Sequence, residues 1–308
     1  MSDMDPANRD RNLGPPEYLV YRVLLEMDRK DGQQTSRTRI HKLCCLVDRR
    51  LKEQYGRDIG LPTHWYMYGR VVEEALIDRS VIFQGKAAHF SGNAYYPADQ
   101  IRDSDFEHLE AELKDDISRA VLEVIDDHGA KSAEELREYQ YREFAPNDFV
   151  RAYGDLRWHL QLIQDRQPDV TFSLFLPPDE KSRIERMLDE MLVAFDAENN
   201  SEIYELYLDW DDTFRMMNEM GRSPRELLEF LEMFIEAVAK LGFRFEDHAH
   251  ITDGRLEEWE RENDEIERDL VNEIQRKRNE ALEQRAYGES LERVSEAYND
   301  AIFDELED

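Results

Sequence analysis

Apolar residues recur at three- and four-residue intervals between Thr35 and Gly56, and this spacing predicts a helix with one buried face. The positions that share this face are Ile40, Leu43, Cys44, Val47 and Leu51. Ser36 or Thr35 can supply the N-cap oxygen, and Gly56 follows where a left-handed C-cap favours glycine. The chain then enters the cluster His64-Trp65-Tyr66-Met67-Tyr68, which is too aromatic for an ordinary surface loop. We expect the rest of the chain to be organised around this stretch, residues 35–72.

The same periodicity predicts further helices in the first half, over about residues 17–29, 103–128, 133–141 and 147–163. After Val72 the chain is expected to stay helical through Asp78. Between residues 81 and 96, short β-branched and aromatic runs separated by Gly and Asn predict a small β-hairpin. Residues 1–15 are polar and charged, and we expect them to be a disordered lead-in.

The second half is predicted to be a separate helical domain. Proline-rich residues 167–180 break the pattern and predict a linker between a domain of residues 16–166 and one of residues 181–308. Three amphipathic helices follow, and from about Gly254 the apolar stripe narrows between dense charges. This narrow stripe predicts a long helical hairpin that breaks at Gly288, or an imperfect coiled coil. The expected fold class is mainly α, with a β-hairpin in the first domain and an acidic helical bundle in the second.

The charge balance is extreme. The 308 residues include 71 Asp and Glu against 40 Lys and Arg, a net charge of −31. Residues 179–308 alone hold 39 acids and 16 bases. Because the acid is spread over whole helices and Arg outnumbers Lys, the composition favours a protein of a halophilic organism. The alternative is an acidic protein that mimics nucleic acid or docks a basic partner.

The sequence indicates a cytoplasmic protein without a cofactor. It has no apolar N-terminal run typical of a signal peptide, and no apolar stretch approaches the ~20 residues of a membrane span. The two cysteines, Cys44 and Cys45, are adjacent on the predicted helix, where a disulfide between them would be strained, so we expect reduced thiols. Glycine-rich phosphate-binding patterns and the Gly-x-Ser-x-Gly pattern are missing.

The aromatic element of Trp65, Tyr66, Tyr68 and Arg70 is the predicted partner-binding site. Trp, Tyr and Arg are the residue types that dominate the energetics of protein interfaces. Packing of Trp65 in the core is the competing interpretation. Arg70 is of particular interest, because a charge is seldom buried without a partner.

Two other groups could carry a function. A basic row on the central helix could meet the phosphates of nucleic acid; it comprises Arg37, Arg39, Lys42, Arg49 and Arg50. His248 and His250, beside Asp247 and Asp253, are weak candidates for metal ligands. His-x-His ligands usually come from a strand, whereas this segment is expected to be a solvated loop, so no metal site is predicted.

Three segments of the first half carry a family resemblance. The first is Arg39-Ile40-His41-Lys42-Leu43, the second spans residues 64–72, and the third, residues 125–136, is a helix, a glycine stop and a new helix start. Over about residues 17–155 they resemble the Panacea domain, the SocA-like antitoxin family. Arg70 stands where that family usually has proline, and Tyr139-Gln140 where it has Thr-His. The resemblance implies a helical domain that binds and neutralises a toxin, with no chemistry of its own.

Taken together, these patterns predict a non-enzymatic protein-binding module, antitoxin-like or adaptor, with the Trp65–Arg70 element at the contact. Its partner would be a protein, such as a toxin, and the C-terminal helices could form a homodimer. One alternative is a DNA-associated regulator that uses the basic face of residues 37–52. The other is a metal-dependent enzyme centred on His248 and His250.

Overall fold

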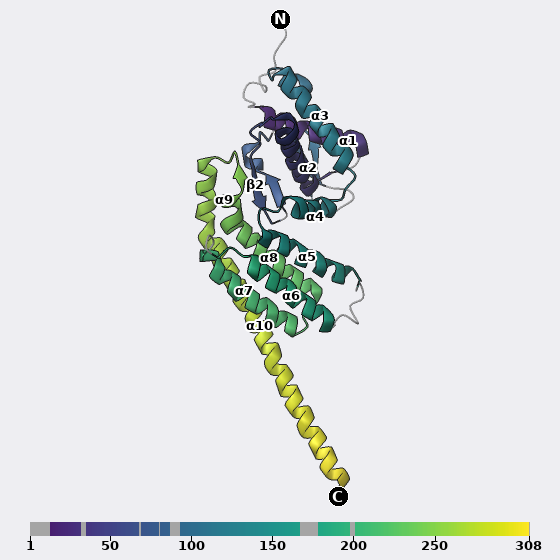
Figure 1. The fold of residues 1–308 in the computed structure, drawn as a ribbon, viewed down its shortest axis with the longest axis vertical. Coiled ribbons are helices and arrows are strands. Elements are labelled where there is room, and N and C mark those ends of the chain that lie inside the picture. The colour runs from purple at the N-terminus through teal and green to yellow at the C-terminus, as the bar shows by residue number, and fades with distance from the viewer. Residues whose placement is uncertain are drawn as a thin grey trace. The chain divides into compact units, whose positions relative to one another are not determined.

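The computed structural model describes residues 13–31, 35–67, 69–79, 81–86, 93–166, 178–197 and 201–307. The chain is mainly α, as predicted, with a few short antiparallel strands (Figure 1). No helix within these ranges combines the length and the hydrophobicity that crossing a membrane requires.

The contacts within the chain divide it into two compact units. Unit 1 comprises residues 1–146 and 243–260, and unit 2 comprises residues 147–242 and 261–308. This division differs from the predicted linker at 167–180, because α5 (Asp148–Arg166) packs against helices of unit 2. Residues 167–177 of that linker and residues 1–12 of the predicted lead-in lie outside the described residues.

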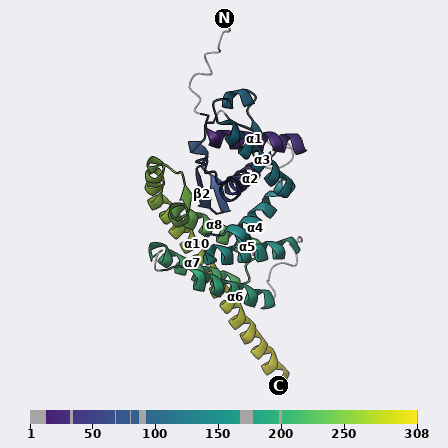
Figure 2. The ribbon, with the colours of Figure 1, turned by 45° about the horizontal axis from the view of Figure 1, so that its top comes forward.

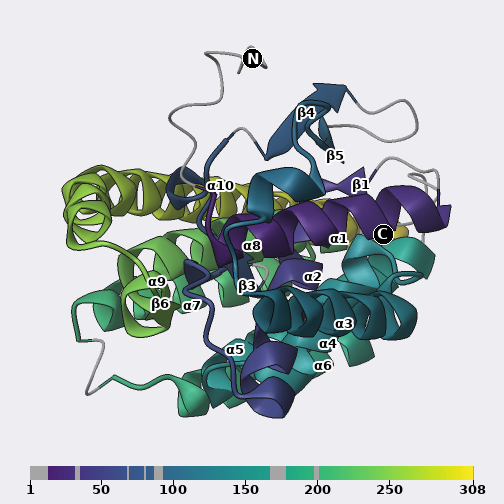
Figure 3. The same ribbon diagram turned by 90° about the horizontal axis from the view of Figure 1, so that it is seen from above.

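The longer helices of unit 1 form the expected scaffold, in which α1 packs against α2 and α3 (Figure 3). The helices are α1 (Pro15–Asp31), α2 (Arg37–Arg50), α3 (Ala111–His128), α4 (Ala133–Phe144) and the short α9 (Arg244–Glu246). Ser36 caps α2 by accepting from the amide of Arg39, and a π-helical turn, η2 (Leu51–Tyr55), extends it to Gly56 at φ 64°. All five residues of the predicted apolar face of α2 are buried.

Unit 1 also holds two small antiparallel sheets among its described residues. In the first, β4 (Ile82–Lys86) and β5 (Asn93–Pro97) form the predicted hairpin, and β1 (Thr35–Ser36) pairs with β5. The second sheet was not predicted: β2 (Thr63–Tyr66) pairs with both β3 (Gly69–Val72) and β6 (His248–Ala249). The aromatic cluster therefore lies on a hairpin. The helix expected after Val72 is reduced to the 3-10 turn η3 (Glu74–Leu76).

Unit 2 is an all-helical bundle around a stack of aromatic rings. Its helices are α5, α6 (Pro178–Ala194), α7 (Ser201–Glu219), α8 (Pro224–Val238) and the larger part of α10 (Asp253–Glu307). The π-helical turn η5 (Ala239–Phe243) directly follows α8. Helix α5 packs against α6 and α8, and α7 contacts both α6 and α8 (Figure 2). The rings of Trp210 and Phe234 stack at a centroid distance of 4.4 Å.

Helix α10 replaces the predicted helical hairpin. It is a single helix of 55 residues that continues through Gly288. In Figure 1 its C-terminal part extends away from the other helices of unit 2. One glycine inside a helix costs only about 1 kcal/mol relative to alanine, and no proline follows Gly288 to end the helix.

Candidate functional site

A pocket of about 420 Å³ opens in unit 1 beside the β2–β3 hairpin, and we call it the hairpin pocket. Its floor is largely apolar and contains Cys45, Leu46, Trp65 and Phe144. Its rim carries the partly exposed charged residues Arg49, Lys52, Glu53, Arg70 and Asp247, and the buried Asp48 also lines it. The pocket thus combines side chains from α2, η2, β2, β3, α4 and the segment that leads into β6. Two residues of the predicted partner-binding site, Trp65 and Arg70, belong to it, and so do Arg49 of the basic row and His248.

Each of the three cationic side chains of the rim has a carboxylate partner. Arg49 Nε donates to Glu53 at 2.6 Å, and its guanidinium lies 3.8 Å from the centroid of the Phe144 ring. Lys52 Nζ donates to Asp48 Oδ2 at 2.9 Å. The third pair joins Arg70 to Asp247. These pairs fix the rim before any ligand arrives, which lowers the entropic cost of binding.

Asp247 holds the hairpin in place. Its main-chain oxygen accepts from the Trp65 amide at 2.8 Å, and its carboxylate accepts from Arg70 Nη2. Arg70 Nη1 also donates to Thr63 Oγ1 at 2.9 Å. The Trp65 side chain is only 2% exposed, and its ring meets that of Tyr141 edge-on, whereas the Arg70 side chain is 30% exposed. Trp65 is therefore a wall of the pocket, and Arg70 is the residue that a ligand can reach.

The inner side of the hairpin lies against buried polar side chains. Lys42 is fully buried, its Nζ donates to the Arg70 main-chain oxygen at 3.1 Å, and burial lowers the pKa of Lys42 to about 7. The Tyr141 hydroxyl donates to the Met67 main-chain oxygen. Gly69 has φ 92°, and a Cβ there would lie 2.5 Å from Gln140 Oε1 and 3.1 Å from Lys42 Nζ. Only glycine allows this close approach.

Residues from three elements of unit 1 meet at this point. Lys42 comes from α2, Gly69 and Arg70 come from β3, and Gln140 comes from α4. These positions are far apart in the sequence. Their contact makes the hairpin and its pocket the best-defined candidate site in the described part of the chain.

The predicted aromatic element is split between two surfaces. Successive strand residues point to opposite faces, so Trp65 and Arg70 line the hairpin pocket, whereas His64 and Tyr66 line a second pocket of about 390 Å³. The prediction that Trp65, Tyr66 and Arg70 form one contact surface is therefore corrected. Tyr68 lies outside the described residues. In the second pocket, burial and nearby cations such as Arg244 lower the pKa of His64 to about 3, so this histidine is neutral.

The basic row of α2 is paired within unit 1. The partners, in chain order, are Glu74 for Arg37, the main-chain oxygen of Gly129 for Arg39, that of Arg70 for Lys42, Glu53 for Arg49, and Glu123 with Asp127 for Arg50. The side chains of the basic row thus bind groups on several neighbouring elements. Such pairing reduces the number of cations that could meet nucleic-acid phosphates.

The histidine cluster contains a short strand where a loop was expected. His248 is exposed in β6, opposite His64. His250 has φ 57°, a left-handed conformation that breaks the strand alternation, and its Nε2 lies 2.8 Å from Asp58 Oδ1. Within the described residues, no group of three His, Cys, Asp or Glu side chains is arranged to hold a metal ion.

The two thiols belong to the core. Cys44 and Cys45 are both buried and not joined by a disulfide. Burial raises the pKa of Cys44 well above its usual value and that of Cys45 to about 12. Both side chains are therefore protonated at neutral pH and are poor nucleophiles.

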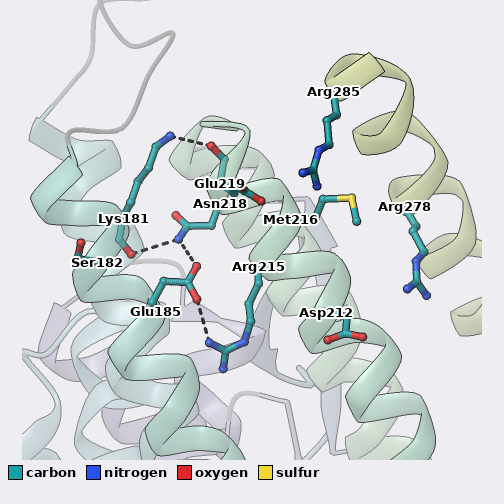
Figure 4. A pocket seen from close by; sticks show the side chains of 10 residues that line it. All are labelled: Lys181, Ser182, Glu185, Asp212, Arg215, Met216, Asn218, Glu219, Arg278 and Arg285. Carbon is teal, nitrogen blue, oxygen red and sulfur yellow. Dashed lines mark hydrogen bonds and ion pairs between the residues drawn. The ribbon is translucent and has the colours of Figure 1, made fainter. Parts of the chain in front are cut away.

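A pocket of about 680 Å³ lies in unit 2 between α6, α7 and α10. Figure 4 shows its central hydrogen bonds: Asn218 Nδ2 donates to the Lys181 main-chain oxygen at 3.2 Å and to Glu185 Oε1 at 2.7 Å. Arg215 Nη1 donates to Glu185 Oε2 at 2.9 Å. These bonds join α6 to α7, which is a structural role.

Comparison with protein-family models, with curated proteins and with solved structures finds no match to the chain. The resemblance to the Panacea domain therefore stays a prediction.

The sequence pattern missed several residues of the hairpin pocket. Gln140 was noted only as a departure from the family pattern, and Asp247 only as a neighbour of the histidines. Asp48 follows the apolar face of α2 and looks like an ordinary solvated residue in the sequence. A Gly at the start of β3, which marks a close backbone approach in a strand, was the one local signal that could have indicated the buried polar contacts.

Proposed function

We propose that this chain is a non-enzymatic protein-binding module, antitoxin-like or adaptor in role, that holds its partner at the hairpin pocket. The observation that carries the proposal is the contact of the β2–β3 hairpin with Lys42 and Gln140, which fixes Trp65 and Arg70 beside an open pocket. A well-packed apolar floor inside a polar rim is the arrangement of an interface hot spot. The pocket volume also falls in the range of protein ligand pockets.

Two features favour binding over the alternatives. The cations of the basic row are engaged by groups of unit 1, which weakens the case for a DNA-associated regulator. His250 has a left-handed conformation, and its ring contacts Asp58. This arrangement fits a fixed loop better than a metal-dependent enzyme.

The finer parts of the proposal rest on the sequence. The partner is a protein, and a toxin is the partner that the family resemblance implies. The cytoplasm of a halophilic organism is the proposed location, where exposed acid keeps the protein hydrated. Apolar residues recur at three- and four-residue intervals from Leu291 to Ile302 of the sequence, and we propose that the C-terminal helical region forms a homodimer. Light scattering at native salt tests the dimer, and a monomer mass would contradict it.

Affinity purification from the native cells at native salt, followed by mass spectrometry, tests the binding function. We expect a stoichiometric protein partner with the wild-type chain and its loss with Arg70→Ala or Asp247→Asn. Arg276→Ala is the matched control, because Arg276 is an exposed, carboxylate-paired residue of α10 in unit 2. A partner that is retained by the Arg70 and Asp247 variants would contradict the proposed site.

A further inference from the structure

We infer that the hairpin pocket receives an arginine side chain of the partner, whose guanidinium binds Asp48. The inference rests on the proposed function and names the chemistry of the partner at the same site. It follows from which hydrogen-bonding groups of the pocket are already satisfied and which are not.

The cationic donors of the pocket are already engaged, whereas one carboxylate oxygen has no donor. The three cationic side chains are each paired with a carboxylate. In contrast, Asp48 Oδ1 is buried without a hydrogen-bond partner, and Asp48 is only 5% exposed. A buried acceptor without a partner is costly and uncommon in folded proteins. A ligand with N–H donors would satisfy this oxygen.

Charge favours a cation over a neutral donor. Only one oxygen of Asp48 is used by Lys52, and burial raises the pKa of this carboxyl despite that ion pair. A guanidinium beside Asp48 would offset the burial of the carboxylate charge, which Lys52 offsets only in part. At longer range, the net charge of −31 attracts basic partners.

The shape of the pocket also fits arginine. The aliphatic stem of the side chain would pack on Leu46 and Trp65 of the floor, while the planar guanidinium presents its donors in a fixed fork. The Trp65 ring can add a cation–π contact. An acidic side chain would offer no donor to Asp48 Oδ1 and would leave that oxygen unpaired.

The test uses the full ¹⁵N-labelled chain at native salt and follows the Trp65 indole NMR signal. The probes are N-acetyl-arginine methylamide and N-acetyl-citrulline methylamide, which have the same shape but differ in charge. We expect a saturable shift with the arginine probe and at least tenfold weaker binding of the citrulline probe. Asp48→Asn is expected to weaken binding of the arginine probe by at least tenfold.

A control variant keeps the test decisive. Asp212→Asn changes an exposed carboxylate of unit 2 and should leave binding of the arginine probe unaffected. Equal binding of both probes, tighter binding of N-acetyl-glutamate methylamide, or no binding of the arginine probe would overturn the inference. In each of these cases, Arg70-dependent capture of a partner would still support the proposed function, so the two failures are distinguishable.

Discussion

Unit 1 buries lysine, histidine and carboxylate side chains around a short hairpin, whereas unit 2 buries a stack of aromatic rings. In unit 1, Lys42, His64, Glu73 and Gln140 are all buried close to the second sheet. The stack in unit 2 comprises Tyr207, Trp210, Phe214, Phe230 and Phe234. Apolar packing stabilises a fold with little dependence on detail, while a buried polar network fixes one geometry at a cost in stability. The difference indicates that the buried polar network marks the site in unit 1, which also has an apolar core of its own, and that the ring stack stabilises unit 2.

The largest effect is expected from the aromatic stack of unit 2. Trp210 is fully buried and its Nε1 donates to the Phe230 main-chain oxygen at 3.2 Å. Trp210→Ala should lower the free energy of unfolding by about 3–5 kcal/mol, because it leaves a cavity and removes the hydrogen bond to Phe230. Chemical denaturation at native salt measures this loss. A change below about 1 kcal/mol would contradict the assignment of stability to this stack.

The next effect is expected at the hairpin. Gly69→Ala should cost about 3 kcal/mol, since alanine would combine an unfavourable φ of 92° with a contact of 2.5 Å to Gln140 Oε1. Gly60→Ala separates the two causes: φ is 74° but no atom lies within 4 Å of the added Cβ, so we expect about 1 kcal/mol. Gly254→Ala, with open space and an ordinary φ, should have no measurable cost. Equal losses of stability for Gly69→Ala and Gly60→Ala would show that the close contact with Gln140 does not contribute to the cost at Gly69.

Lys42 gives the hairpin a dependence on pH. Its folded pKa of about 7 is lower than its usual value of 10.5, because burial disfavours the charged form. The unfolded chain therefore binds the extra proton between these values, and the Lys42 contribution to stability rises with pH across that window by up to about 1.4 kcal/mol per unit. The contribution is complete above pH 10.5 and is lost as the pH falls to 7.

Lys42→Met should remove this dependence. The measurement is the difference in unfolding free energy between wild type and Lys42→Met from pH 7 to 10. In this difference the contributions of most other titrating groups cancel. A difference that does not change with pH would show that Lys42 stays charged in the folded chain.

The smallest effect is expected from the surface ion pairs of unit 2. Arg276 is half exposed and pairs with Glu273 and Glu280 on the same helix. Arg276→Gln should change the free energy of unfolding by no more than about 0.5 kcal/mol, because exposed pairs are screened by solvent and salt. Thermal melts of the two proteins at native salt provide the check. A loss above about 2 kcal/mol would contradict the view that the rings, and not the ion pairs, stabilise unit 2.

Local patterns predicted the helices well. The five apolar positions predicted for the central helix are all buried, Ser36 caps its start, and Gly56 follows the π-helical turn at its end. Each of these features depends on residues within a few positions of one another. Periodicity and capping residues therefore carry enough information to predict them.

Long-range features were not predictable in the same way. Strand β2 has only four residues, and β6, one of its partners, lies about 180 positions later in the chain. The burial of Lys42 depends on a glycine and a glutamine from two other elements, and no local pattern encodes that contact. Without the strand, the alternation that separates Tyr66 from Trp65 could not be anticipated.

Hydrogen–deuterium exchange of the full chain, with and without the captured partner, tests the central claim most directly. The account predicts slower exchange on binding in residues 42–53, 63–67, 69–72 and 247–249, with no change in α7. It further predicts that Arg70→Ala abolishes this protection while leaving exchange of the free protein unaltered elsewhere. Protection confined to α7 or α10 would place the interface in unit 2 and contradict the hairpin pocket as the binding site.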